Sequence, residues 1–150
     1  MRETTLCYIE KNDKYLILHR TKKKLDGSYE KWIGVGGKFE EGEDAYRCVS
    51  REVKEETGFD IKSPDYRGKV YFHSDTWEDE IMHLFTVKSF SGTMIECNEG
   101  ELVWVDKDKV LDLPTWEGDR LFLTRLLSDE KYFELELFYE GENLVKHKFL

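Results

Sequence analysis

Residues 43–57 carry the clearest periodicity in the chain, and they predict one amphipathic helix. The apolar residues that recur at the 3.6-residue period and form its core-facing stripe are Ala45, Tyr46, Val49 and Val53. Gly58 follows Thr57 as the expected helix stop. A helix with one apolar stripe must bury that stripe against another element, so this segment constrains the chain to a layered fold.

The segments around this helix predict a sheet. The predicted strands share apolar or alternating sequence bounded by turn residues, and they span residues 5–10, 14–20, 32–39, 69–74, 81–90, 101–106, 132–140 and 143–150. A second amphipathic helix is predicted at residues 115–129. This order fits an α+β fold, a mixed sheet with helices on its faces, better than a regular βαβ alternation. Without a linker or repeat, residues 1–150 are expected to form one domain.

The composition limits the partners of the chain. The net charge of -9 argues against a nucleic-acid polymer or an anionic membrane as the main partner. The three cysteines (Cys7, Cys48 and Cys97) form no C-x-x-C pair, which favours reduced thiols in a cytoplasmic protein. No signal core or membrane-length apolar run is present, so a cytoplasmic location is expected. The sequence leaves monomer and homodimer open.

Three glutamates crowd one face of the predicted helix. Glu52, Glu55 and Glu56 stand at i, i+3 and i+4, where like charges cost about 0.2–0.5 kcal/mol per pair. Their arc adjoins Val49 and Val53, so we expect them at the boundary of the core. Magnesium or manganese would relieve this repulsion, because hard cations prefer several carboxylate oxygens. The pattern alone is more typical of a Glu/Lys-rich surface helix.

The spacing of residues over a longer stretch distinguishes a metal site from an ordinary surface helix. From Gly37 the chain reads Gly, five residues, Glu43, seven residues, then REVKEETGF at residues 51–59. This resembles the box of the Nudix hydrolases, G-x5-E-x7-R-E-U-x-E-E-x-G-U, and every specified position matches. The resemblance implies a Nudix-type α/β/α sandwich in which the box is a loop–helix–loop. It also implies hydrolysis of a nucleoside diphosphate linked to another group, with magnesium or manganese.

The resemblance assigns roles residue by residue. It implies that the metal ligands are the box carboxylates and one backbone carbonyl, namely Glu52, Glu55, Glu56 and Gly36. One of the carboxylates, often the one that matches Glu52, acts as general base, and Arg51 orients the glutamates. The positions with structural roles are Gly37, Glu43 and Gly58. Lys38 follows the double glycine, where it either contacts a phosphate or is a solvated lysine.

Marks outside the box resemble the MutT-type enzymes that act on oxidised purine nucleotides. In that comparison Glu99 matches a further metal ligand, Trp116 a residue that stacks on the purine, and Asp119 an acid that bonds the base edge. A turn carboxylate, a core tryptophan and a helix N-terminal charge are the structural alternatives. Ile33 departs from the asparagine of the mammalian pattern, which leaves the exact base open.

Arg20 and the lysines that follow it, Lys22, Lys23 and Lys24, could hold a triphosphate tail, although a solvated basic loop is the more frequent explanation for such a run. Together these features predict a magnesium-dependent diphosphatase of 8-oxo-dGTP-like nucleotides, which would cleanse the nucleotide pool and so protect DNA. A nucleotide-sugar or dihydroneopterin triphosphate hydrolase, and a catalytically silent nucleotide-binding module, are the alternatives. The four histidines show no ligand spacing.

Overall fold

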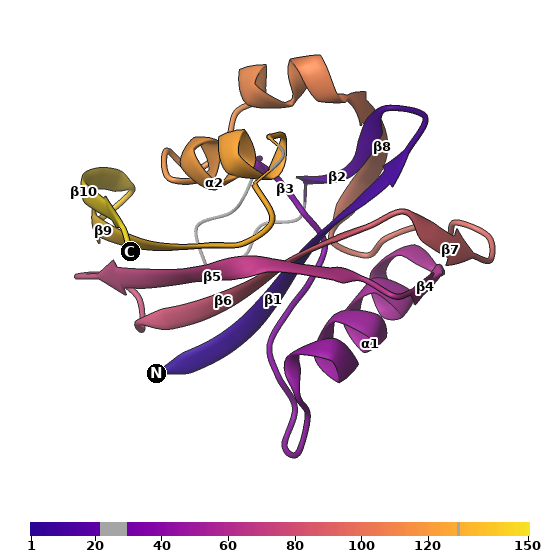
Figure 1. The fold of residues 1–150 in the computed structure, drawn as a ribbon, viewed down its shortest axis with the longest axis horizontal. Coiled ribbons are helices and arrows are strands. Elements are labelled where there is room, and N and C mark those ends of the chain that lie inside the picture. Colours follow the sequence, from indigo (N-terminus) through magenta and orange to yellow (C-terminus); the bar gives the residue numbers. More distant parts are fainter. Residues whose placement is uncertain (22–29, 129) are drawn as a thin grey trace.

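The computed structural model describes residues 1–21, 30–128 and 130–150. Its strands are β1 (Arg2–Lys11), β2 (Lys14–Arg20), β3 (Trp32–Ile33), β4 (Asp60–Lys62), β5 (Asp65–Ser74), β6 (Glu80–Val87), β7 (Ser89–Ser91), β8 (Gly100–Asp106), β9 (Phe133–Glu140) and β10 (Asn143–Phe149). Its helices are α1 (Ala45–Thr57), the 3-10 helix η1 (Lys107–Asp112) and α2 (Asp119–Leu126). Figure 1 shows their arrangement.

The main sheet is mixed. Its path is β10-β9-β5-β6-β1-β2-β3, with β8 paired to β2, and β4 and β7 form a small separate sheet. The β1–β6 and β5–β9 pairs are parallel, whereas the other pairs of the main sheet are antiparallel. Strands β1 and β2 pair only near their shared turn, at Glu10 and Lys11. Beyond that turn they diverge, and the segment at residues 33–38 runs between them.

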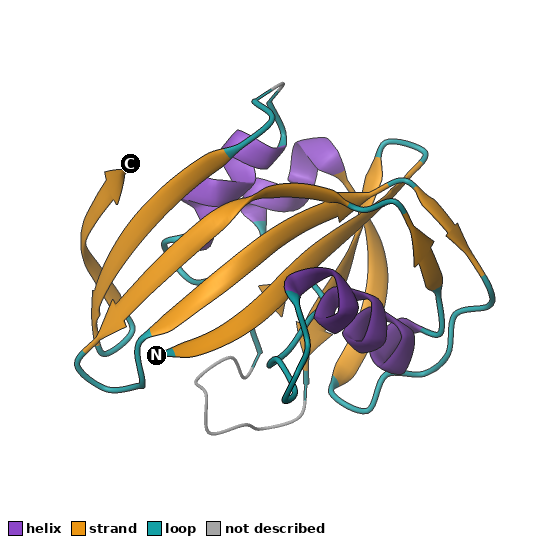
Figure 2. Ribbon diagram, turned by 60° about the horizontal axis from the view of Figure 1, so that its bottom comes forward, coloured by secondary structure: helices purple, strands orange, loops and turns teal. Residues whose placement is uncertain are grey.

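Helices cover both faces of this sheet. In Figures 1 and 2, α1 lies on one side of the strands, and α2 with η1 lies on the other. Along β1, Leu6 and Tyr8 belong to the core beneath α2, whereas Cys7 and Ile9 belong to the core beneath α1. Because side chains alternate along a strand, burial on both faces produces the continuous apolar run of this segment. The predicted α+β sandwich is confirmed.

Several predicted boundaries were wrong. The strand predicted at residues 32–39 is regular only at Trp32–Ile33, and the rest meets β1 through bridges at Val35 and Lys38. Helix α2 begins only at Asp119. Tyr46, predicted to face the core, is 50% exposed and packs edge-on against Phe85. The short strands β4 and β7 and the helix η1 lacked a strong periodic signal because each is six residues or shorter.

Within the described residues, no helix has both the length and the apolar character needed to cross a membrane.

Candidate active site

Local sequence fixes both ends of α1, the helix that carries the glutamates. The Asp44 carboxylate caps its N-terminus by accepting a hydrogen bond from the Arg47 backbone N–H at 2.8 Å. Gly58 ends the helix in the left-handed conformation at φ 85°, and its N–H donates to the Lys54 carbonyl. These two caps set the start and end of the helix, and therefore the face on which Glu52, Glu55 and Glu56 stand.

Arg51 ties this helix to the preceding loop. Its guanidinium donates to both carboxylate oxygens of Glu43, at 2.6 and 2.9 Å, and to the Lys38 carbonyl at 3.0 Å. It also donates to Glu52 at 2.9 Å and to Glu55 at 3.3 Å. The hydrogen bonds from Arg51 lower the pKa of Glu43 to about 2. Because Arg51 lines neither cavity described below, its geometry suits a positioning role.

The glycine pair brings backbone to the carboxylates. Val35 and Gly37 face β1, since the Val35 carbonyl accepts from Cys7 and the Gly37 carbonyl from Thr5. In an extended strand the residue between them faces the opposite way, and the Gly36 N–H does donate to Glu56 Oε2 at 3.2 Å. This hydrogen bond brings the Gly36 backbone to the edge of the carboxylate cluster, where its carbonyl oxygen is a candidate metal ligand.

Four carboxylates line a cleft of about 210 Å³. Its walls are Glu52, Glu55, Glu56, Cys97, Asn98 and Glu99. Burial is the largest cause that raises the pKa of Glu56, followed by its hydrogen bond with Glu99 and the charge of that carboxylate. Burial likewise raises the pKa of Glu52, which Arg51 opposes. Without a cation, the Glu56–Glu99 pair therefore holds a proton near neutral pH.

The expected position of the glutamates at the core boundary holds only in part. The Glu52 side chain is 16% exposed and Glu56 is partly buried, whereas the Glu55 side chain is 56% exposed. Glu55 lies farther round the helix from the buried stripe, where Arg51 reaches it from solvent. The expectation was therefore wrong for Glu55.

The chemistry of this cleft fits a hard divalent cation. Carboxylate oxygens and a backbone carbonyl are the ligands that magnesium and manganese prefer. Among the described residues, no three acidic, histidine or cysteine side chains already stand as a ligand set. Glu52 and Glu55 turn toward Arg51, and Glu56 pairs with Glu99. A bound cation would have to displace these pairings. The chemical types of the donors therefore fit such a cation, although the side chains do not stand in the rotamers that would bind it.

A second cavity, of about 690 Å³, adjoins the acidic cleft, because Glu56 and Glu99 line both. Its other lining residues include Gly36, Lys38 and Arg20 near the carboxylates, and Trp116, Trp77 and Asp119 farther along. The Arg20 guanidinium is buried and lies 3.6 Å from Glu99. The cavity thus joins an acidic end with basic side chains to an aromatic end. The run Lys22 to Lys24 lies outside the described residues.

Asp119 is buried at the aromatic end. It is 5% exposed, and burial raises its pKa to about 8, an effect that the charge of Lys31 partly opposes. Asp119 and Trp116 line the same cavity, as their three-residue spacing predicted. The Asp119 carboxyl is therefore largely protonated near neutral pH and can both donate and accept hydrogen bonds.

Sequence reasoning missed several residues of this cavity. Trp77 meets Trp116 edge to face, with ring centroids 5.4 Å apart. Tyr139 meets Trp116 in the same way at 5.6 Å, and Arg2 pairs with Glu80. Arg2 lies on β1, Tyr139 on β9, Trp77 in the turn between β5 and β6, and Glu80 at the start of β6. All four lie far from the box in sequence. No local pattern marks them, because only tertiary contacts bring them together.

Comparisons with known proteins agree with this geometry. The model of the NUDIX domain matches residues 1–126. The uncharacterized Nudix hydrolase YvcI of Bacillus subtilis is 32% identical over 79% of this chain and 75% of its own length. The oxidized purine nucleoside triphosphate hydrolase of Danio rerio is 29% identical over 79% of this chain and 76% of its own.

Among solved structures, the crystal structure of a MutT protein from Bacillus halodurans superposes with a TM-score of 0.87 and 27% identity. That match covers 99% of this chain and 97% of the other. The membership of the Nudix family that the box predicts is therefore confirmed. The chain belongs to the Nudix family and is a hydrolase of nucleotide substrates.

Proposed function

We propose that this Nudix hydrolase acts on purine nucleoside triphosphates with an oxidised base, such as 8-oxo-dGTP, and releases the nucleoside monophosphate and pyrophosphate. The observation that carries the proposal is the single cavity with carboxylates at one end and Trp116 and Asp119 at the other. The likeness to an oxidized purine nucleoside triphosphate hydrolase supports the same substrate class. In the cell this reaction would remove damaged precursors before they enter DNA.

The aromatic end suits a purine. Trp116 offers a ring for stacking, which is worth about 1–3 kcal/mol per base but discriminates little between bases. Asp119 supplies the discrimination, because its neutral carboxyl donates to a base carbonyl while it accepts from a ring N–H. A base without the matching groups would leave this buried carboxyl unpaired, which is costly. Ile33, also in the cavity wall, adds apolar contact and no base-reading polar group.

The acidic end suits the triphosphate. Lys38 and Arg20 place positive charge in the cavity wall, and Arg20 lies 3.6 Å from Glu99. Nudix hydrolases generally use divalent metal ions. Glu52, Glu55, Glu56, Glu99 and the Gly36 carbonyl would hold such ions, magnesium or manganese in this proposal. When bound, the ions neutralise the phosphate oxygens and acidify a bound water.

The residues of the chain then account for the hydrolysis. Water attacks the β-phosphorus, a new P–O bond forms, and the bond between that phosphorus and the α–β bridging oxygen breaks. The bridging oxygen leaves with the nucleoside monophosphate, and a carboxylate accepts the proton of the water. Glu52 suits this base role because Arg51 fixes its position and burial raises the pKa of its carboxyl above the ordinary value, an effect that Arg51 opposes.

A substrate panel tests the proposal. We expect kcat/KM for 8-oxo-dGTP to exceed the values for dGTP, dCTP, nucleotide sugars, ADP-ribose and dihydroneopterin triphosphate, with pyrophosphate as the second product. A higher kcat/KM for one of the other compounds would assign the enzyme to that substrate instead. Tight binding of 8-oxo-dGTP without any product would favour the silent binding module.

A second prediction concerns Glu56. Glu56→Gln should fold with wild-type stability in the absence of metal, since the wild-type carboxyl already shares a proton with Glu99. Turnover of the best substrate should fall by about 10²–10⁴-fold. Glu101→Gln, at an exposed glutamate outside both cavities, is the matched control and should retain activity. Wild-type turnover in Glu56→Gln would remove this residue from the proposed machinery.

A further inference from the structure

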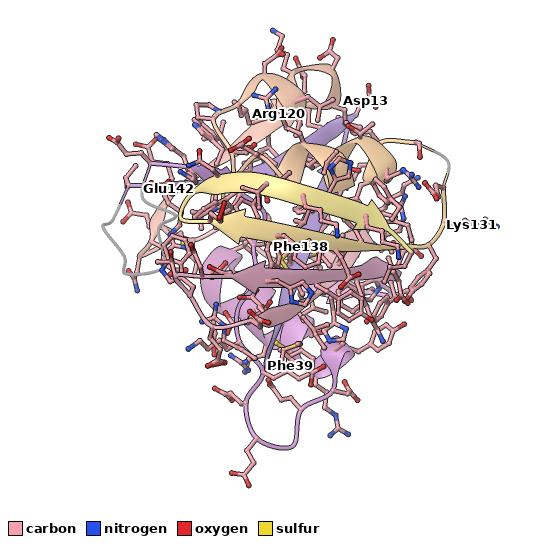
Figure 3. The ribbon with its side chains drawn as sticks, turned by 90° about the vertical axis from the view of Figure 1, so that its left-hand side faces the viewer. Asp13, Phe39, Arg120, Lys131, Phe138 and Glu142 are labelled. Carbon is pink, nitrogen blue, oxygen red and sulfur yellow. The ribbon has the colours of Figure 1, made fainter. Side chains whose placement is uncertain are left out.

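The β9–β10 hairpin contacts both walls of the aromatic end of the cavity. Figure 3 looks onto this hairpin, with Glu142 at its tip. On one side, the Gly141 N–H donates to Asp75 at 2.9 Å, in the turn that carries Trp77. On the other side, the hairpin contacts the segment that carries Trp116. The match to the NUDIX domain ends at residue 126, before this hairpin begins.

Three consecutive residues at Trp116 are held by the hairpin. Tyr139 packs edge-on against Trp116, and its hydroxyl accepts from the Gly118 N–H at 2.7 Å. Glu117 accepts from the Leu144 N–H at 3.1 Å. A Cβ at Gly118 would lie 2.5 Å from a methyl carbon of Leu137 and 2.7 Å from the Tyr139 hydroxyl oxygen, so these hairpin side chains would have to shift to admit any larger residue.

Lys31 completes these contacts. Its Nζ lies 2.8 Å from the Glu142 carboxylate and 4.7 Å from the centroid of the Trp116 ring. Trp116 lines the cavity but Lys31 does not, so the ammonium group lies over the Trp116 ring without forming part of the cavity wall. A cation against a π face draws electron density from the ring, which favours stacking of an electron-rich base on the other face.

We propose that the Lys31–Glu142 ion pair and the β9–β10 hairpin hold Trp116 in the orientation that stacks on a purine base, which makes Lys31 a positioning residue for base selection. This inference rests on the proposed function for the identity of the ligand. The shared Nudix core then supplies the phosphate chemistry, and the hairpin outside the matched region adapts the enzyme to the base. Because Glu142 is exposed, breaking the pair should cost the fold little.

Lys31→Met tests the proposal, because methionine keeps the reach over Trp116 and removes the charge. We expect KM for the purine nucleoside triphosphate to rise about 3- to 10-fold while kcat changes less than about twofold. The affinity for 8-oxo-dGMP, titrated by quenching of tryptophan fluorescence, should weaken by the same factor. Affinity for dCMP should change less, because a pyrimidine stacks over a smaller area.

Three further variants sharpen the test. Lys31→Arg keeps the charge, so its KM and its affinity for 8-oxo-dGMP should stay close to the wild-type values. Glu142→Gln should act in the same direction as Lys31→Met and add little to it, since both remove one interaction. Lys14→Met breaks a surface ion pair between the start of β2 and Asp106 at the end of β8, outside both cavities, and should leave both constants unchanged. An unaltered affinity in Lys31→Met, or a fall in kcat at constant KM, would overturn the proposal.

Binding and turnover are measured separately, so the two proposals fail separately. If the wild type binds 8-oxo-dGMP but releases no pyrophosphate from 8-oxo-dGTP, the proposed function is wrong and the affinities still test the role of Lys31. If the wild type is active and Lys31→Met binds equally well, only the role of Lys31 is wrong. A wild type that binds no purine nucleotide contradicts both.

Discussion

Asp119 and Glu56 are both carboxylic acids with raised pKa values, but their surroundings differ. Burial alone raises the pKa of Asp119, with Lys31 opposing it. Glu56 is raised by burial and also by a second carboxyl, Glu99, with which it shares a hydrogen bond. An isolated neutral acid suits recognition of a neutral base edge, whereas a pair of acids suits a cation. In the proposed function, carboxylic acids would therefore serve two different tasks at the two ends of the cavity.

The titration of Asp119 gives a prediction at the residue scale. Its carboxyl ionises near its usual pKa of 3.8 when unfolded and near about 8 when folded. Between these values the unfolded state releases more protons, so the free energy of unfolding falls as pH rises. The Asp119→Asn variant has no carboxyl to ionise at this position, so its free energy of unfolding lacks this decrease with pH. Its stability relative to the wild type should therefore increase from about pH 4 to about pH 8, by at most about 1.4 kcal/mol per pH unit, and then level off.

Urea unfolding of Asp119→Asn and wild type across this pH range checks the prediction, with the exposed Asp108→Asn variant as a control for the loss of one surface charge. A stability difference that is constant with pH would show that Asp119 is ionised in the folded protein. Its proposed role as a hydrogen-bond donor to the base would then be wrong.

At the scale of elements, the box connects the loop that contains Gly36 and Gly37 to helix α1, and the loop packs closely against both β1 and α1. Gly36 lies against the backbone of β1, where an added Cβ would sit 1.9 Å from the Thr5 carbonyl oxygen. Gly37 lies against α1, where an added Cβ would sit 2.5 Å from the Glu52 carboxylate carbon. The two adjacent glycines therefore serve different elements. The first allows the loop to pack on the sheet, and the second makes room for a glutamate of the active site.

This difference predicts that one of two matched variants loses mainly stability and the other mainly activity. Gly36→Ala should lower the free energy of unfolding by about 1–3 kcal/mol, because backbone atoms of β1 must move. Gly37→Ala should cost less stability, since the Glu52 side chain can rotate away, but it should lower kcat more than its stability loss explains. Urea unfolding and steady-state kinetics on both variants measure this. A stable Gly36→Ala, or a fully active Gly37→Ala, would contradict the assignment.

At the scale of the whole molecule, the candidate active-site cavity lies where β1 and β2 diverge. The segment from Ile33 to Lys38 enters this gap, α1 lies on one face, and the α2 side contributes Trp116 and Asp119. The chain brings a net charge of -9 to a reaction on a polyanion. Its overall field therefore opposes substrate entry, and cations at the acidic cleft would reverse that opposition locally.

Metal binding should therefore stabilise the fold as a whole. If magnesium or manganese binds the folded cleft and not the unfolded chain, as proposed, a concentration of 100 times Kd should add about 2.7 kcal/mol and raise Tm by several degrees. Glu56→Gln should lose most of this rise, and Glu101→Gln should keep it. Calorimetry in magnesium chloride and in sodium chloride of equal ionic strength separates binding from screening. An equal rise in both salts would contradict a site in this cleft.

The sequence by itself determined the parts of this protein that depend on local spacing. Helix α1, its Gly58 stop, the three glutamates on it and the β1–β2 hairpin follow from periodicity and turn chemistry, and the box identified the family. The run from Trp32 to Phe39 was misjudged because its apolar residues suggest a regular strand, whereas its glycines allow the backbone to depart from one.

The tertiary structure alone decided which distant residues share the cavity. The burial of Asp119, the contact of Trp77 with Trp116, and the support that Tyr139 and Glu142 give from the hairpin all join residues far apart in the chain. Periodicity tells which face of an element is apolar, but it does not tell which other element will cover that face. Desolvation, and therefore the charge state of Asp119, depends on that covering.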